Sequence, residues 1–143
     1  MTASPRAVEL AVASARAAAD KQATEVLALD VSDQLVITDV FVLAAAANDR
    51  QVRAVVDAVE DALAELGAHV TRREGLNEAR WVLLDFGEIV VHVQLAEDRQ
   101  YYALERLWKD GPVIELPEDV TRPRSAVDAA SAASAGDGQR LGG

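Results

Sequence analysis

The chain has 143 residues, of which 50% are hydrophobic, and this size and composition fit one globular domain with a single core. It contains no cysteine, which excludes disulfide bonds, thiolate zinc sites and cysteine nucleophiles. Three of its 14 basic and two of its 24 acidic side chains follow Val120, so the residues up to Val120 carry a net charge of −11, which argues against direct binding to nucleic acid.

The first third of the chain predicts a helix followed by two strands. The helix is expected over residues 5–20, where alanines predominate and Ser4 precedes a proline at a typical helix start. Two short apolar runs, residues 25–31 and 38–46, predict the strands. The second run leads into four alanines, Ala44 to Ala47, whose helix propensity leaves the end of that strand open.

The clearest amphipathic helix follows Asn48 or Asp49, either of which can cap it, and continues to Gly67. Its apolar residues recur at spacings of three and four, so we expect them to pack on a sheet. They are Val52, Val55, Val56, Val59, Leu63 and Leu66. The solvated face is expected to carry Glu60, Asp61 and Glu65.

Beyond this helix, residues 69–73 weakly predict a third strand, and residues 81–86 and 89–95 predict a β-hairpin. Gly87 and Glu88 separate the two hairpin strands and suit a two-residue turn with glycine first. Because successive strand residues point to opposite sides, the hairpin has two faces. One is entirely apolar and consists of Val82, Leu84, Phe86, Ile89, Val91 and Val93. The other is mixed and consists of Trp81, Leu83, Asp85, Val90, His92 and Gln94.

The C-terminal part predicts one more helix and a tail. Glu97 and Asp98 suit a helix N-terminus, and a glycine and a proline at 111–112 end the element. Tyr101, Leu104 and Trp108 lie at helical spacing between them. From residue 122 onward alanine, serine, glycine and aspartate predominate, with little apolar surface to bury. We therefore expect one domain over residues 1–120 and a disordered tail over residues 121–143.

The sequence contains no motif that requires an enzyme. It has neither a dinucleotide-binding glycine pattern nor a P-loop. His69 and His92 lie far apart and outside any close-spaced ligand motif, so we expect no metal and no cofactor. No apolar run approaches the ~20 residues that span a bilayer, and no signal peptide pattern opens the chain. The expected location is the cytoplasm, with no membrane partner.

Three aspartates and one histidine form the ambiguous group. Asp30 and Asp85 lie in otherwise apolar strands, where a carboxylate must be exposed, hydrogen-bonded or functional. Strand-end or turn capping is the structural explanation, and a site that also includes Asp39 is the functional one. Asp85 and His92 lie diagonally across the hairpin, close enough for their side chains to interact.

Trp81 has two interpretations. It can lie beneath a helix as part of a core, or it can anchor a protein partner, because tryptophan, tyrosine and arginine dominate binding hot spots. Arg99, Tyr101 and Tyr102 follow it late in the chain and strengthen the second interpretation. Periodicity alone leaves both open.

Four strings carry a resemblance to a known family. They are LALDV at 27–31, TDVFVL at 38–43, EG at 74–75 followed by WVLLDFGEIVVHV at 81–93, and DRQYYALERLW at 98–108. In this order and spacing they make the chain resemble the ribosomal silencing factor family, also called iojap-like, over about residues 7–110.

The resemblance implies an α+β domain whose mixed β-sheet is flanked by helices, similar to the nucleotidyltransferase core but without its catalytic signature. It also implies a non-catalytic protein that binds the fourteenth protein of the large ribosomal subunit, sterically blocks joining of the small subunit, and represses translation when nutrients are short. Family members are often homodimers. The family's characteristic residues fall at Asp30, Asp39, Glu74, Gly75, Trp81, Asp85, Gly87, His92, Arg99, Tyr102, Leu104, Glu105, Leu107 and Trp108. The chain departs from the family at Ala44 to Ala47, where small polar residues are usual, and at Val40, where an aromatic residue is common.

The leading hypothesis is therefore a binding protein whose acidic surface meets a basic ribosomal protein and not RNA. Its expected contact residues are Trp81, Leu83, Asp85, His92, Arg99, Tyr101 and Tyr102. A rival hypothesis is a magnesium-dependent nucleotidyltransferase-like enzyme with Asp30, Asp39 and Asp85 as ligands, although the paired-carboxylate spacing is missing. A third is a dimeric scaffold with no ribosomal role.

Overall fold

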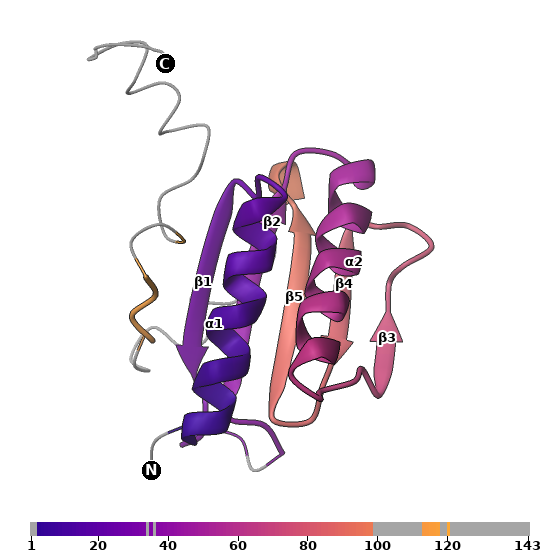
Figure 1. Ribbon diagram of the computed structural model, residues 1–143. Coiled ribbons are helices and arrows are strands. Elements are labelled where there is room, and N and C mark those ends of the chain that lie inside the picture. Colours follow the sequence, from indigo (N-terminus) through magenta and orange to yellow (C-terminus); the bar gives the residue numbers. More distant parts are fainter. Residues whose placement is uncertain (1–2, 34, 36, 99–112, 118–119, 121–143) are drawn as a thin grey trace, which may run out of the picture.

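The computed structural model describes residues 3–33, 35, 37–98, 113–117 and 120. Helices α1 (Pro5–Asp20) and α2 (Asp49–Glu65) lie side by side on one face of a five-stranded sheet (Figure 1). The strands are β1 (Glu25–Asp30), β2 (Val40–Ala46), β3 (Arg72–Glu74), β4 (Trp81–Asp85) and β5 (Ile89–Leu95), and a short 3-10 helix, η1 (Ala96–Asp98), follows β5. The expected α+β class with a mixed sheet is confirmed.

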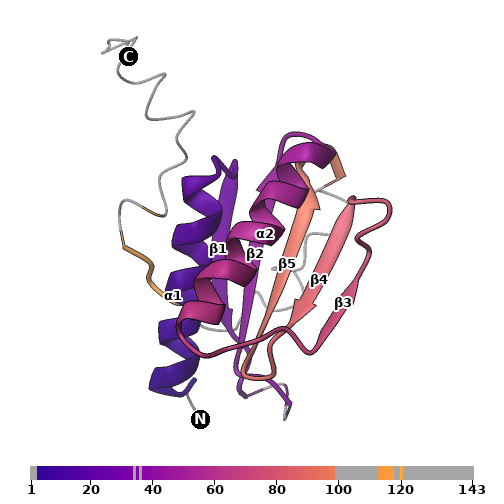
Figure 2. The ribbon, with the colours of Figure 1, turned by 45° about the vertical axis from the view of Figure 1, so that its right-hand side comes forward.

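The sheet has the strand order β1-β2-β5-β4-β3. Strands β2 and β5 run parallel at its centre, with Val40 opposite Ile89, and all other neighbouring strands are antiparallel. The parallel pair needs a crossover connection, which here consists of α2 followed by β3 and β4. The predicted hairpin is confirmed: the Phe86 N–H donates to the Ile89 carbonyl, and Gly87 has a φ of 90° in the turn. Figure 2 shows β3 at the far edge of the sheet.

Both helices begin and end close to the predicted residues. The Ser4 hydroxyl accepts from the Ala7 N–H at the start of α1, and the Asn48 side chain accepts from the Gln51 N–H at the start of α2. These caps satisfy N–H groups that have no partner within the helix. The small buried residues of α1 allow its axis to lie close to the sheet, and the predicted valine stripe of α2 is buried beside it.

The main core fills the space between the helices and the sheet. It includes the entirely apolar hairpin face that alternation predicted, and it extends to buried residues of β2 such as Val40 and Val42. A smaller cluster of Leu29, Val31 and Leu43 lies on the opposite face, which we call the second face of the sheet. The second face carries the mixed side of the hairpin.

Two sequence expectations need correction, and two others fall outside the described residues. The third strand runs from Arg72 to Glu74 and not over 69–73, and its exposed residues have no apolar alternation to mark their position. The sequence placed helices around the sheet, and the α-helices α1 and α2 both lie on one of its faces. The helix expected after Glu97 and the tail over 121–143 lie outside the described residues. No helix in the described part is long and apolar enough to cross a membrane.

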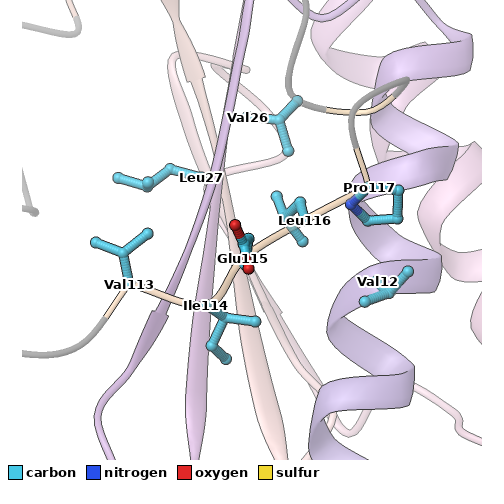
Figure 3. Close-up of a pocket in the computed structure, with 8 residues that line it drawn as sticks. All are labelled: Val12, Val26, Leu27, Val113, Ile114, Glu115, Leu116 and Pro117. Carbon is cyan, nitrogen blue, oxygen red and sulfur yellow. The ribbon is translucent and has the colours of Figure 1, made fainter.

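Residues 113–117 cover the outer edge of β1. The Ile114 N–H donates to the Ala28 carbonyl, and Leu116 is buried in the main core together with Val120. Between this segment, β1 and Val12 of α1 lies an open apolar groove of about 800 Å³ (Figure 3). Glu115 is the one charged residue among the described residues of its lining, and these residues do not form the convergent polar groups typical of a ligand site.

Candidate functional site

The second face of the sheet holds four of the predicted contact residues. Trp81, Leu83 and Asp85 lie on β4 and are partly exposed, whereas His92 lies on the central strand β5 and is buried. Leu83 is directly opposite His92 in the antiparallel register. Arg99, Tyr101 and Tyr102, which complete the predicted set, lie outside the described residues.

Trp81 and His92 are joined by a hydrogen bond. The indole Nε1–H of Trp81 donates to Nδ1 of His92 over 3.0 Å. An indole nitrogen can only donate, so Nδ1 must accept, and the neutral imidazole then carries its proton on Nε2. That Nε2 atom is buried and has no hydrogen-bond partner among the described residues.

The surroundings of His92 keep its ring neutral. The residue is 4% exposed, and burial lowers the pKa of His92 from 6.5 to about 4. Phe41 of β2 contacts the imidazole edge to face, with 4.8 Å between ring centroids. A proton added at Nδ1 would face the indole N–H, so charging this ring also breaks the hydrogen bond to Trp81.

Asp85 caps the hairpin turn. Its Oδ1 accepts from the Gly87 N–H over 2.8 Å, as the turn-capping interpretation predicted. Asp85 and His92 are diagonal neighbours, as expected, but the described structure contains no hydrogen bond between them; His92 pairs with Trp81 and Asp85 with the turn. Asp85 therefore belongs to the rim of the second face, near the turn.

Asp30 and Asp39 hold the beginning of α1. The Asp30 carboxylate accepts from the Ala3 N–H and from the N–H and hydroxyl of Ser32, and Asp39 accepts from the Ser4 N–H. Burial opposes the charge of Asp30, but the hydrogen bonds from Ser32 and Ala3 outweigh it and lower its pKa. Two carboxylates at a helix N-terminus also complement the helix dipole.

The structure gives a physical reason for glycine at position 75, which the family resemblance singled out. It has a φ of 86°, and a Cβ atom placed there would lie 2.1 Å from the Trp81 carbonyl oxygen. Only glycine allows the backbone before β4 to approach Trp81 this closely. The backbone of Trp81 is thus fixed by a residue that has no side chain.

Sequence reasoning missed residues that other elements add to the second face. Phe41 lies on β2, and alternation along VFVL already set it apart from the buried Val40 and Val42. Leu35, in the loop between β1 and β2, packs against the same small cluster as Trp81. Ile37 in that loop is 83% exposed, an unusual position for a large apolar side chain.

Comparison with known proteins agrees with this architecture. The family model "Ribosomal silencing factor during starvation" matches residues 4–140. The ribosomal silencing factor RsfS of Bacillus subtilis is 42% identical over 102 residues, which are 71% of this chain and 86% of that protein. The chloroplastic Iojap protein of Zea mays is 30% identical over 118 residues, 80% of this chain and 50% of that protein.

Solved structures share the fold. A crystal structure of a Bacillus halodurans protein has a TM-score of 0.66 at 36% identity and covers 79% of this chain and 100% of that chain. A Chromobacterium violaceum crystal structure gives the same TM-score at 30% identity, covering 83% of this chain and 96% of that chain. The chain therefore belongs to the ribosomal silencing factor family, also called RsfS or Iojap.

Proposed function

We propose that this protein binds the large ribosomal subunit and prevents it from joining the small subunit. The observation that carries the proposal is the family match over residues 4–140, together with relatives that are named ribosomal silencing factors. Members of this family act without catalysis, so the action is steric. Repression of translation under nutrient limitation follows from a pool of subunits that cannot join.

The partner we propose is a basic protein at the subunit interface, the fourteenth protein of the large subunit. The residues up to Val120 carry a net charge of −11, and such a surface is attracted to a basic protein and repelled by exposed phosphates. Charge therefore favours contact through protein and disfavours contact through RNA.

The proposed contact surface is the second face of the sheet. Both described helices cover the other face, which leaves Trp81, Leu83 and Asp85 accessible in part along β4. Trp81 is the expected anchor, because a large aromatic side chain in a shielded position dominates many interfaces. Arg99, Tyr101 and Tyr102 extend the proposed surface beyond the described residues.

Sedimentation with isolated large subunits tests the proposal. Wild-type protein should co-sediment and should reduce the formation of joined ribosomes, and Trp81→Ala should weaken binding by about 2 kcal/mol. Leu66→Ala is the matched control, because Leu66 is also a partly buried apolar residue but packs on the helix side of the sheet. Failure of the wild type to co-sediment, or co-sedimentation without any effect on joining, would refute the function.

The proposed homodimer can be tested by a separate measurement of mass. The resemblance implies a homodimer, which light scattering on the purified chain would detect as twice the mass of 15.2 kDa. A monomeric mass at the concentrations used for binding would mean that one copy is the active form.

The nucleotidyltransferase-like alternative has little support at its proposed ligands. Asp30 and Asp39 already accept hydrogen bonds from backbone N–H groups at the start of α1, and Asp85 caps a turn. In the part of the chain that the structure describes, no three acidic or histidine side chains are grouped as metal ligands. Magnesium-dependent heat of nucleoside triphosphate binding in calorimetry would revive this alternative.

A further inference from the structure

The hydrogen bond between Trp81 and His92 joins the proposed anchor residue, Trp81, to a buried imidazole ring. Trp81 begins the edge-side strand β4, and His92 lies in the middle of the central strand β5, diagonally across the pair. His92 is held from both sides, by Phe41 edge to face and by Trp81 through its indole nitrogen. Residues that are buried in a central strand have little freedom to move, so His92 is a fixed acceptor.

We propose that His92 is a positioning residue, whose Nδ1 fixes the indole ring of Trp81 in the orientation that meets the ribosomal partner. The inference rests on the proposed function, because it takes Trp81 as the anchor. His92 itself need not touch the partner, because it is only 4% exposed. Because His92 already restricts the orientation of the indole, less conformational entropy is lost when Trp81 binds the partner.

Two contacts constrain Trp81 at opposite ends. The backbone at Gly75 lies against the Trp81 carbonyl and restricts the Trp81 backbone, and His92 holds the indole nitrogen. The tryptophan ring is thus constrained at its backbone and at its polar atom. The small apolar cluster of Leu29, Val31 and Leu43, against which Trp81 packs, supports the ring.

The hydrogen bond also determines what Trp81 can offer a partner. Its N–H is already used inside the protein, so a partner meets the ring surface and does not gain a hydrogen-bond donor. Cationic side chains bind aromatic ring faces, and arginine and lysine are abundant on a basic protein. We therefore expect a cationic or apolar side chain of the partner opposite Trp81.

A pair of nearly isosteric variants tests the positioning role. In His92→Asn the side-chain oxygen can take the place of Nδ1 as an acceptor, whereas His92→Leu has a similar shape and no acceptor. The first readout is the indole N–H resonance of Trp81 in ¹⁵N-labelled protein, with Trp108→Phe used to assign it. The second readout is the affinity for isolated large subunits.

We expect His92→Asn to keep a hydrogen-bonded indole resonance and an affinity within about threefold of the wild type. His92→Leu should lose that resonance and weaken binding by roughly tenfold, since a hydrogen bond of this kind corresponds to about two- to tenfold in an equilibrium constant. In a Trp81→Phe background, which has no indole nitrogen, the same leucine substitution should have no further effect.

The outcomes separate the two proposals. If folded His92→Leu binds as tightly as the wild type, or if its effect persists in the Trp81→Phe background, the positioning role is wrong while the proposed function stands. If the wild type itself does not bind large subunits, the proposed function is wrong. A lost resonance together with a loss of affinity that disappears in the Trp81→Phe background supports the positioning role.

Discussion

Gly75 and Gly87 share a positive φ but differ in what surrounds them. A Cβ at Gly75 would overlap the backbone carbonyl of Trp81, whereas a Cβ at Gly87 would meet nothing within 4 Å. Glycine is therefore required at the two positions for different physical reasons. At Gly87 the cause is conformational alone, and at Gly75 it is also the close approach of two backbone segments.

Alanine at the two glycines should therefore have unequal effects. We predict that Gly87→Ala lowers the free energy of unfolding by about 1–2 kcal/mol, the cost of a positive φ, and that Gly75→Ala lowers it by at least about 3 kcal/mol. Urea unfolding of both variants measures the difference. Equal losses would show that the backbone near Trp81 adjusts to a side chain at position 75.

His92 makes stability depend on pH. Its pKa in the folded protein is about 4, below the ordinary 6.5, so between these values the unfolded chain binds more protons than the folded one. The contribution of neutral His92 to the free energy of unfolding is therefore fully present above about pH 6.5, and it is lost as the pH falls toward 4. We predict that the wild type loses roughly 3 kcal/mol more than His92→Asn between about pH 7 and about pH 4.

The asparagine variant is the appropriate reference for this titration. Asp30, whose pKa is lowered, also reduces stability at acid pH, but it is present in both proteins and its contribution cancels. Denaturant unfolding at a series of pH values gives both curves. Parallel curves would mean that His92 titrates near its ordinary pKa in the folded protein.

At the scale of elements, the sequence predicts most local structure and little of the sheet order. Alternation and capping identified both helices, β1, β2 and the hairpin. The exposed residues of β3 carry no apolar pattern, so its position was wrong by a few residues. Nothing local indicates that β5 pairs with β2 in parallel, because that pairing depends on how α2 packs across the sheet.

The candidate site shows the same limit. Register places both Trp81 and Asp85 diagonally from His92, and a sequence cannot choose between two equal neighbours. The choice follows from the turn, where the Gly87 N–H engages the Asp85 carboxylate and leaves His92 to the indole. Of the predicted contact residues, Trp81, Leu83, Asp85 and His92 lie on one face, but the hydrogen bond between Trp81 and His92 was not predicted.

The buried alanines of α1 leave little room for larger side chains between this helix and the sheet. Ala15 is fully buried against the sheet, whereas Ala64 on α2 is exposed, so the same substitution tests opposite environments. We predict that Ala15→Leu destabilises the protein by about 1–3 kcal/mol through overpacking, and that Ala64→Leu changes stability by under about 0.5 kcal/mol. Thermal unfolding measures both, and a neutral Ala15→Leu would show unfilled space under α1.

At the scale of the whole molecule, residues 113–117 and Val120 add the last described contacts to the folded domain. The backbone of this segment pairs with β1, and Leu116 and Val120 complete the main core. The edge of β1 is thereby covered, and an uncovered strand edge invites pairing with other chains. The sequence placed the domain boundary after residue 120, a position that stays a prediction.

Two changes test that boundary. Removing residues 121–143 should alter the free energy of unfolding by under about 0.5 kcal/mol, whereas Leu116→Ala in the full chain should cost about 2 kcal/mol. Urea unfolding of the two proteins, compared with the wild type, measures both effects. A large loss on removal of the tail would place part of it in the folded domain.

The parallel pairing of β2 with β5 delays folding of the sheet during synthesis. The apolar strand β2 is complete at Ala46, but its central neighbour ends only at Leu95. At about 5–20 residues per second the ribosome needs roughly 2.5–10 s to make the intervening segment. During that interval one side of β2 has no native partner, and non-local pairing of this kind folds slowly. The nascent chain is therefore most exposed to aggregation just before β5 is complete.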